Sequence, residues 1–450
     1  MRHILHTIYL TACLTLAALF ASCDSDGTTP AHDGSPVSVT LRISTPHSTS
    51  ATRSDKSVTG SGAEWTDDNA SEGEMMHNCF AVIVQGGQIQ SIIQSDEYED
   101  EKSYVGTLAT KINPGITTIY SFANIHPADI GLDANASFPC ALPEGFDGKY
   151  FTVDGNQTSV SAFSSGIPMS NRQTVEITNK TQQVDLEVIR MVAKVRLKLT
   201  NVTPNDFTVK SVSLSDITSN STDNIRLLPN GDTDLQPAIS PTAAKTEYTV
   251  SLGEGKKLKA NGEETLDVVF YVNESEAATP KYFVINVETN QSNVSHRVAM
   301  LKWDKIARND YLVIPIKLND YRITFDVEQF SAIGVLPSVT YESNKLTVRF
   351  HGYGDFHMRP HLIRISDGKE LTPGTNLPDG WWLEDWQTLE MNPEGGDGVS
   401  IYDTAPTPNH ASRMIEGTVG ERNGYALHQL LFGVSGLDYA IPFKVQIIKE

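Results

Sequence analysis

Cys23 is the residue whose chemistry the sequence defines best. It follows the small residues Ala21 and Ser22, at the end of an apolar stretch that begins after Arg2. That stretch of about fifteen residues is too short for a permanent membrane helix and has the size of a cleaved secretory signal. We therefore predict a lipoprotein signal peptide over 1–22 and an acyl (palmitate) lipid on Cys23 at the outer membrane; the alternative is an ordinary signal peptide beside a chance cysteine.

Two further cysteines would remain in the mature chain. Cys13 would leave with the signal and Cys23 would be acylated, so only Cys79 and Cys140 can react. They can form a disulfide in an oxidising exterior, or stay as two separate buried thiols. The sequence leaves both alternatives open.

Catalytic motifs are missing from the sequence. There is no His-Glu-x-x-His pair and no Gly-rich phosphate loop ending in Lys-Ser or Lys-Thr, and the run 433–436 has the wrong spacing for a nucleophile elbow. His351, His357 and His361 come closest to a metal site, but their spacing fixes no ligand geometry in a β-rich segment. We expect a protein that is not an enzyme, with no metal and no cofactor.

The charge of the chain restricts its partners. The net charge is −20 over 450 residues. Because a phosphate backbone requires a basic surface, this charge argues against a nucleic-acid partner. It also argues against a polybasic membrane anchor, so any membrane attachment would depend on Cys23.

The elements that must carry these residues are strands. Apolar and polar residues alternate with a period of two along many short segments, between turn signals such as Asn261-Gly262. This pattern is typical of sandwiches and barrels, and nothing indicates a strand-helix-strand repeat. We predict an all-β fold, whose clearest strands hold Val37 to Ile43, Val195 to Leu199, Leu312 to Leu318, Leu346 to Phe350 and Ile441 to Ile447.

Composition divides the chain coarsely. Residues 44–73 are rich in Ser, Thr, Gly and Asp, which predicts an exposed loop, with Arg53 in its middle. From residue 328 onward Gly, Pro and aromatic residues increase, so 328–450 is expected to be a separate β-rich module. Trp381, Trp382 and Trp386 lie in it and are candidates for stacking on a ligand's sugar rings, although such side chains more often fill a core.

Four short motifs in order give the chain a family resemblance. The segment Glu187 to Arg196 contains Arg-x-x-Ala-Lys-Val, which resembles the junction opening the second domain in the Bacteroidetes fimbrillin superfamily, the type V pilus (fimbria) proteins. The others resemble that family's Ile-Pro-Met turn, its late strand and its Arg-Asn-x-x-Tyr motif, which is one residue short here. They lie at Gly166–Ser170, Phe270–Ser275 and Ile306–Tyr311.

The resemblance implies two tandem β-sandwich domains, at 54–189 and 190–327. It also implies a lipoprotein precursor whose first strand, within 23–53, is a propeptide that a trypsin-like protease removes, leaving a groove that a strand of the next subunit fills by donor strand exchange. Cleavage between Arg53 and Ser54 would fit this layout, since the loop is polar. The alternative is a surface arginine in a linker. Asp24 and Asp26 resemble the signal that sends such lipoproteins to the cell surface.

The extra module favours one role within a fibre. A folded domain after the second sandwich would block strand donation, so we expect a tip or accessory subunit with the module facing outward. It would act in cell adhesion, its partners being other pilus subunits and a surface glycan or protein. The alternatives are an anchor that keeps the lipid on Cys23, and a stand-alone surface glycan-binding lipoprotein. Asp403-Thr404-Ala405 resembles an O-glycosylation acceptor of these bacteria, with Thr404 as the modified residue.

Overall fold

The structure is a computed structural model in which most of the chain is strand. It describes residues 35–45, 74–95, 105–202, 204–220, 224–230, 235–277, 282–290, 296–300, 304–318, 320–331, 336–342, 345–396, 399–409, 413–437 and 439–450. Its only helices in these ranges are short 3-10 turns, so the all-β prediction is confirmed. The lipidation candidate Cys23, the processing candidates Arg53 and Ser54, and residues 46–73 of the loop expected over 44–73 lie outside the described residues, while Ser44 ends strand β1.

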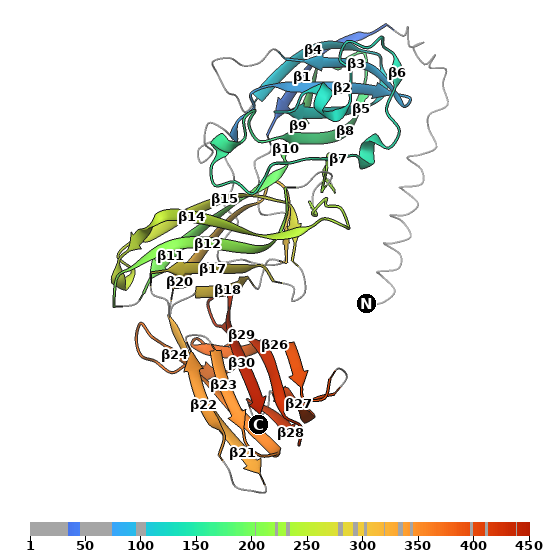
Figure 1. The fold of residues 1–450 in the computed structure, drawn as a ribbon. Helices are drawn as coiled ribbons and strands as arrows, with labels where there is room; N and C mark the ends of the chain where they lie inside the picture. Colours follow the sequence, from blue (N-terminus) through green and yellow to red (C-terminus); the bar gives the residue numbers. More distant parts are fainter. Residues whose placement is uncertain are drawn as a thin grey trace, which may run out of the picture.

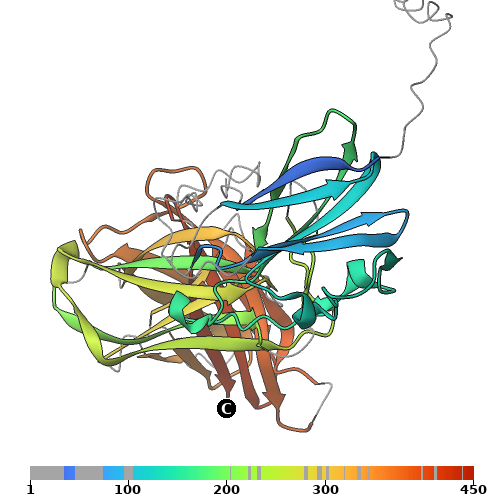
Figure 2. The same cartoon turned by 90° about the horizontal axis from the view of Figure 1, so that it is seen from above.

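The chain forms three β units that follow one another along an elongated molecule (Figure 1). Viewed from above, the three units overlap, which places them in one row (Figure 2). The first unit is blue to green, the second yellow-green, and the third orange to red. Each has its own buried apolar cluster between two sheets.

The first sandwich packs a three-stranded sheet, in the order β4-β1-β9, against a six-stranded sheet in the order β10-β8-β5-β2-β3-β6. Strand β2 is apolar on both faces and lies in the middle of the larger sheet, as a fully buried strand should. It turns into β3 through Gly86 and Gly87, which both have positive φ, as a two-residue hairpin requires. The elements are β1 (Val37–Ser44), β2 (Cys79–Gln85), β3 (Gln88–Gln94), β4 (Val105–Ile112), β5 (Gly115–Ala123), η4 (Pro127–Ile130), β6 (Cys140–Ala141), η5 (Phe146–Gly148), β7 (Tyr150–Phe151), η6 (Val160–Ala162), β8 (Met169–Ile177), β9 (Gln183–Glu187) and β10 (Ile189–Arg190).

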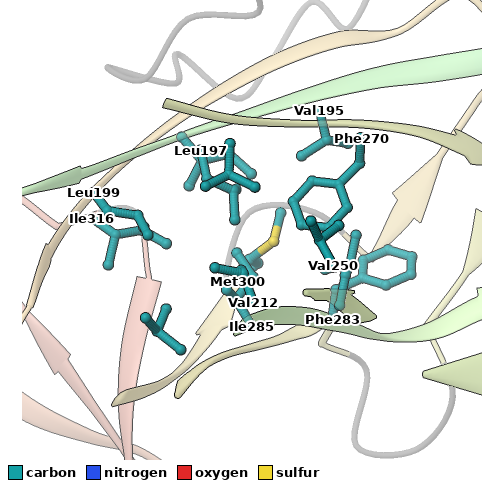
Figure 3. Close-up of a cluster of buried hydrophobic side chains, with 14 of the residues drawn as sticks. Val195, Leu197, Leu199, Val212, Val250, Phe270, Phe283, Ile285, Met300 and Ile316 are labelled. Carbon is teal, nitrogen blue, oxygen red and sulfur yellow. The ribbon is translucent and has the colours of Figure 1, made fainter. Parts of the chain in front are cut away.

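The second sandwich packs the sheet β15-β11-β20 against the sheet β14-β12-β17-β18. Val195, Leu197 and Leu199 point from β11 into the core, as their alternation predicts, and meet side chains of the facing sheet (Figure 3). The elements are β11 (Val192–Asn201), β12 (Phe207–Thr218), β13 (Ile225–Arg226), β14 (Lys245–Leu258), η7 (Ala260–Gly262), β15 (Thr265–Asn273), β16 (Ser275–Glu276), β17 (Val284–Thr289), β18 (His296–Met300), β19 (Lys305–Ile306) and β20 (Tyr311–Leu318).

The two sandwiches repeat one arrangement in their smaller sheets. In the first, β1 lies in the middle, antiparallel to β4 and parallel to β9. In the second, β11 lies in the middle, antiparallel to β15 and parallel to β20. Strand β11 therefore occupies in the second sandwich the position that β1 occupies in the first.

The C-terminal module is a third sandwich, with the sheet β21-β24-β28-β27 facing a sheet in which β23, β30, β29 and β26 are neighbours. Strand β21 pairs along its whole length with β24, so it belongs to a sheet of this module. The elements are β21 (Tyr321–Ser331), β22 (Ser338–Glu342), β23 (Lys345–Phe350), β24 (Gly354–Arg364), β25 (Thr372–Pro373), β26 (Gly380–Pro393), β27 (Tyr402–Asn409), β28 (Met414–Val419), β29 (Gly424–Val434) and β30 (Tyr439–Lys449).

The module is joined to the second sandwich by shared sheet structure. Strand β18 pairs with β30 through Ala299 with Ala440 and Met300 with Tyr439, so one sheet continues across the boundary. Tyr439 is buried in the core of the second sandwich, and its hydroxyl accepts a hydrogen bond of 3.3 Å from the backbone N–H of Lys317. Two strands from distant parts of the chain therefore fix the module against its neighbour.

Candidate functional site

The position of β1 is the structural feature that bears most directly on function. It pairs with β4 over eight residues, from Val37 opposite Ile112 to Ser44 opposite Val105. On its other side it pairs with β9 over five residues, starting at Thr40. Because it lies between two strands, its removal would leave an open slot in the sheet.

One face of β1 is part of the core of the first sandwich. Val39, Leu41 and Ile43 are buried in the cluster formed with β2, β4 and β5. Burying each such side chain contributes roughly 1.5–3 kcal/mol. The opposite face is polar: Arg42 is exposed and lies 3.9 Å from Asp185 of β9, a surface ion pair. A slot emptied of β1 would thus expose apolar pockets at alternate positions.

Glu74 lies at the junction of the first and second sandwiches. Its side chain is fully buried, and its Oε1 lies 2.9 Å from Nζ of Lys194. The hydroxyl of Tyr271 donates a hydrogen bond of 2.5 Å to the same carboxylate. The Arg190 guanidinium donates one of 3.4 Å to the Glu74 carbonyl. Sequence reasoning missed Glu74, because nothing in its polar neighbourhood indicates burial.

A second buried ion pair lies in the same junction. Arg308 and Glu274 are both fully buried, with Nη2 and Oε2 2.7 Å apart. Arg308 also donates hydrogen bonds to the carbonyls of Arg226 (2.7 Å) and Leu227 (3.2 Å) and to Ser170 Oγ (3.4 Å). These partners satisfy most of a guanidinium that would otherwise be buried at high cost.

All four motifs found in the sequence meet in this junction. The first supplies Arg190 and Lys194, and the turn at 166–170 supplies Ser170. The late strand supplies Tyr271 and Glu274, and the last motif supplies Arg308 together with Asn309, whose Oδ1 accepts a bond of 3.2 Å from Arg190. The motif residues therefore hold two domains together, and their buried, mutually paired charges point to a structural and not a catalytic role.

The two candidate disulfide cysteines lie apart, and neither forms a disulfide. Cys140 on β6 is opposite Ile89 of β3, which is opposite Val84 of β2. Cys79 lies five residues before Val84, so the pair is separated by two strand spacings, about 10 Å, and about 16 Å along the strand. A disulfide needs Cα atoms within about 7 Å, so of the two alternatives the structure has the separate thiols.

The three tryptophans lie on β26, but the structure does not bring them onto one exposed surface. Trp381 is 3% exposed and packs edge-on against Phe432 in the module core. Trp382 points to the opposite face, across Gly433, where a Cβ would collide with its ring. Trp386 stacks on buried His428, with ring centroids 4.6 Å apart.

The remaining candidates of the module are on its surface. Thr404 is exposed on the edge strand β27, between two shifts in register with β28, so its hydroxyl is accessible. His361 lies between Glu370 (2.6 Å) and Asp326 (3.0 Å), and its hydrogen bond to Glu370 contributes most to raising its pKa. Within the described ranges no cluster of three or more His, Cys, Asp or Glu side chains is arranged to hold a metal ion.

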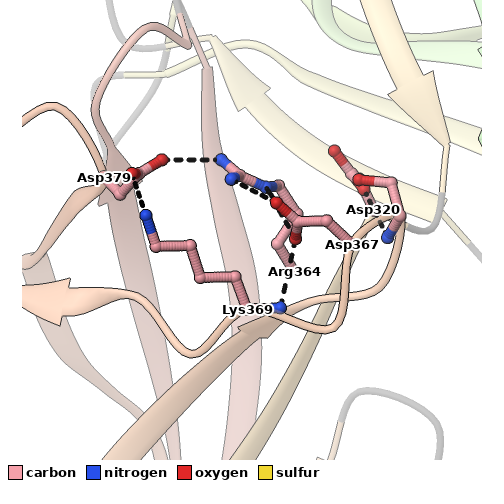
Figure 4. A network of polar contacts seen from close by, with 6 residues as sticks. Asp320, Arg364, Asp367, Lys369 and Asp379 are labelled. Atoms are coloured by element: carbon pink, nitrogen blue, oxygen red, sulfur yellow. Dashed lines mark hydrogen bonds and ion pairs between the residues drawn. The ribbon is translucent and has the colours of Figure 1, made fainter.

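A polar network fixes the point where the chain enters the module (Figure 4). Arg364 donates hydrogen bonds to Asp367 (2.6 Å) and Asp379 (2.9 Å), and Lys369 pairs with Asp379. The bond to Arg364 lowers the pKa of Asp367 to about 2. Two N–H groups of the loop after β24 donate to Asp320, the residue directly before β21. This network and the pairing of β18 with β30 attach the C-terminal module to the second sandwich at two points.

In the part of the chain that the structure describes, no helix is long and apolar enough to cross a membrane. No protein-family model and no curated protein matches the chain.

Solved structures similar to the chain include fimbrial proteins and putative cell adhesion proteins. A tip fimbrial protein from Porphyromonas gingivalis with a C-terminal truncation is 13% identical, with 66% of this chain and 96% of that one covered at a TM-score of 0.36. A fimbrial assembly protein from Parabacteroides distasonis is 9% identical, with 74% and 98% covered and a TM-score of 0.36. A fimbrilin from Porphyromonas gingivalis is 10% identical, with 65% and 90% covered and a TM-score of 0.37.

Proposed function

We propose that the chain is a non-enzymatic subunit of a cell-surface fibre, exported as a lipoprotein through Cys23. In this proposal, cleavage after Arg53 releases β1, and a strand of a neighbouring subunit enters the slot between β4 and β9. The C-terminal module then faces outward, as the tip of the fibre or as an accessory subunit.

The observation that carries the proposal is the way β1 is held. It contributes three buried aliphatic side chains and two sets of main-chain hydrogen bonds, and both kinds of contact can be reproduced by any extended segment with apolar residues at alternate positions. A replacing strand would run antiparallel to β4 and parallel to β9. Strand β11 supports this reading, since it fills the equivalent position in the second sandwich with the same alternation.

The terminal role is supported by β30. It is flanked by β29 and β23 within its own module and also reaches β18 of the second sandwich. A strand engaged in this way is not available for donation to another subunit. A subunit that accepts a strand without donating one stands at the end of a fibre.

The test is the intact mass of the protein recovered from fibres. A chain that starts at Ser54 without lipid supports the proposal. A chain that still carries acylated Cys23 in the fibres favours the anchor role, and a chain absent from fibres favours a stand-alone surface lipoprotein.

Matched variants locate the cleavage. Arg53→Gln should block processing of the precursor by a trypsin-like protease. Arg42→Gln should leave processing unchanged, because Arg42 lies within paired β1, where a protease cannot seat an extended chain. Equal processing of both variants would contradict the assignment of Arg53.

A further inference from the structure

The C-terminal module contains a pocket of about 240 Å³ at the edge of its sandwich. It lies between the end of β24, the end of β27 and the start of β28 on one sheet and the start of β26 on the other. Trp381, Pro360 and Ile415 form its buried part, and Pro373, Pro408 and Met414 are among its walls. All of these residues belong to the described chain.

The residues that line the pocket determine which chemical group can fill it. Proline rings, aliphatic side chains and tryptophan make up most of the lining, and Thr375, Asn409 and Arg413 are its polar side chains. A sugar, whose hydroxyls all need partners, would find few of them there. A flat apolar group, in contrast, would gain contact with the prolines and Met414. The pocket therefore favours an aromatic or similarly flat body.

A residue at the mouth of the pocket determines which charge a ligand should carry. Arg413 lines the mouth and is exposed, and no carboxylate of the described residues pairs with its guanidinium. Two other arginines of the module are paired with carboxylates, Arg364 with Asp367 and Arg349 with Glu450, while Arg359 contacts the sulfur of Met414. In a chain of net charge −20, an unpaired guanidinium beside an apolar pocket is suited to a carboxylate, which it can bind through two parallel hydrogen bonds.

Trp381 lies at the buried end of the pocket. The indole N–H of Trp381 has no hydrogen-bond partner among the described residues, although the residue is 3% exposed. Buried donors without partners are rare in folded proteins, because burial without a hydrogen bond is costly. This nitrogen is itself buried, so Trp381 offers a ligand in the pocket its apolar ring and not its N–H.

We infer that this pocket binds a small carboxylic acid with a flat apolar body, its carboxylate at Arg413 and its body against Trp381 and the prolines. The inference does not depend on the role of the chain in a fibre. It differs from the sugar stacking predicted from the sequence, because Trp386 does not line the pocket and Trp381 contacts the ligand from the module core.

The test uses the full chain with ¹⁵N-labelled tryptophan, titrated with phenylacetate and followed through the indole N–H resonances. Trp381 is identified with Trp381→Phe, or, if that variant does not fold, by elimination with single Phe variants of the other four tryptophans, Trp65, Trp303, Trp382 and Trp386. We expect a saturable shift of the Trp381 resonance with phenylacetate and a much weaker one with phenylacetamide, which has the same shape without the charge.

Arg413→Gln should weaken phenylacetate binding by about tenfold or more, the effect of losing a hydrogen bond to a charged group. Arg422→Gln, which changes another exposed arginine of the module, should leave binding unchanged. The inference is overturned if phenylacetate causes no saturable shift, if phenylacetamide binds equally well, or if the two arginine variants behave alike.

Discussion

The carboxylate of Glu74 lies 2.9 Å from the ammonium group of Lys194, inside the junction of the first two sandwiches. Lys194 is also 5.0 Å from the centre of the Tyr311 ring, a cation–π contact. Glu74 follows the segment that the proposal assigns to cleavage, and Lys194 opens the second sandwich. The pair thus ties the segment that precedes β2 to the second sandwich.

Glu74→Gln is expected to destabilise the protein by about 3 kcal/mol or more, because it leaves the Lys194 ammonium buried without a counter-charge. The measurement is the urea midpoint of unfolding of the full chain. Asp185→Asn is the matched control: it breaks the exposed pair with Arg42 and should change stability by less than about 1 kcal/mol. Equal effects of the two substitutions would contradict the structure at the junction.

Leu41→Asn tests the groove beneath β1. It removes a fully buried aliphatic side chain and places an amide in the apolar cluster of the first sandwich, so we expect a loss of about 3–5 kcal/mol. Ser38→Asn, on the exposed face of the same strand, should change stability by less than about 0.5 kcal/mol. Hydrogen exchange of the β4 amides reports the loss locally, and unchanged protection in Leu41→Asn would show that β1 does not fill this slot.

Tyr341→Phe tests the closure of one edge of the module. The Tyr341 hydroxyl accepts a hydrogen bond of 2.7 Å from the N–H of Phe325 and donates one of 2.9 Å to its carbonyl. Without the hydroxyl the Phe325 amide should exchange faster, by about tenfold for a loss of roughly 1–1.5 kcal/mol. Tyr353→Phe, at a similarly exposed tyrosine, is the control and should leave this amide unchanged.

His428 should make the stability of the module depend on pH. Burial lowers the pKa of His428 from 6.5 to about 4. Between these values the unfolded chain binds a proton that the folded chain does not, so stability falls as the pH falls through this window and is fully present above pH 6.5. The loss amounts to about 3 kcal/mol at most. Urea midpoints at about pH 7 and about pH 4 should differ less in His428→Gln than in the parent protein. An unchanged difference would contradict the burial of this ring.

The alternation of apolar residues was enough to predict the strands but not their partners. Val37 to Ile43 and Val195 to Leu199 are strands with one buried face, as expected, because that pattern depends only on neighbouring residues. That both lie in the middle of a sheet, each beside a parallel strand, depends on residues more than a hundred positions away. A local pattern does not carry that information.

The burial of Glu74 and the attachment of the C-terminal module to the second sandwich could not be predicted from local sequence patterns either. Glu74 looks like part of a solvated loop, and its partners Lys194 and Tyr271 are far along the chain. The pairing of β18 with β30 involves only two residues on each strand, too few to leave a pattern in the sequence. The four motifs, in contrast, did point to residues that matter, although their shared position became clear only in the folded chain.

The parallel pairing of β1 with β9 also constrains the order in which the chain folds. Ser44 and Leu186 are 142 residues apart, and the Ser44 hydroxyl donates to the Leu186 carbonyl at 3.5 Å. During synthesis and export β1 emerges first but cannot complete its sheet until β9 has followed. Pairings between residues so distant in sequence close slowly, since a long loop must be ordered before any contact forms. Until then the apolar face of β1 has no partner, so this strand is the part of the first sandwich that completes its packing last.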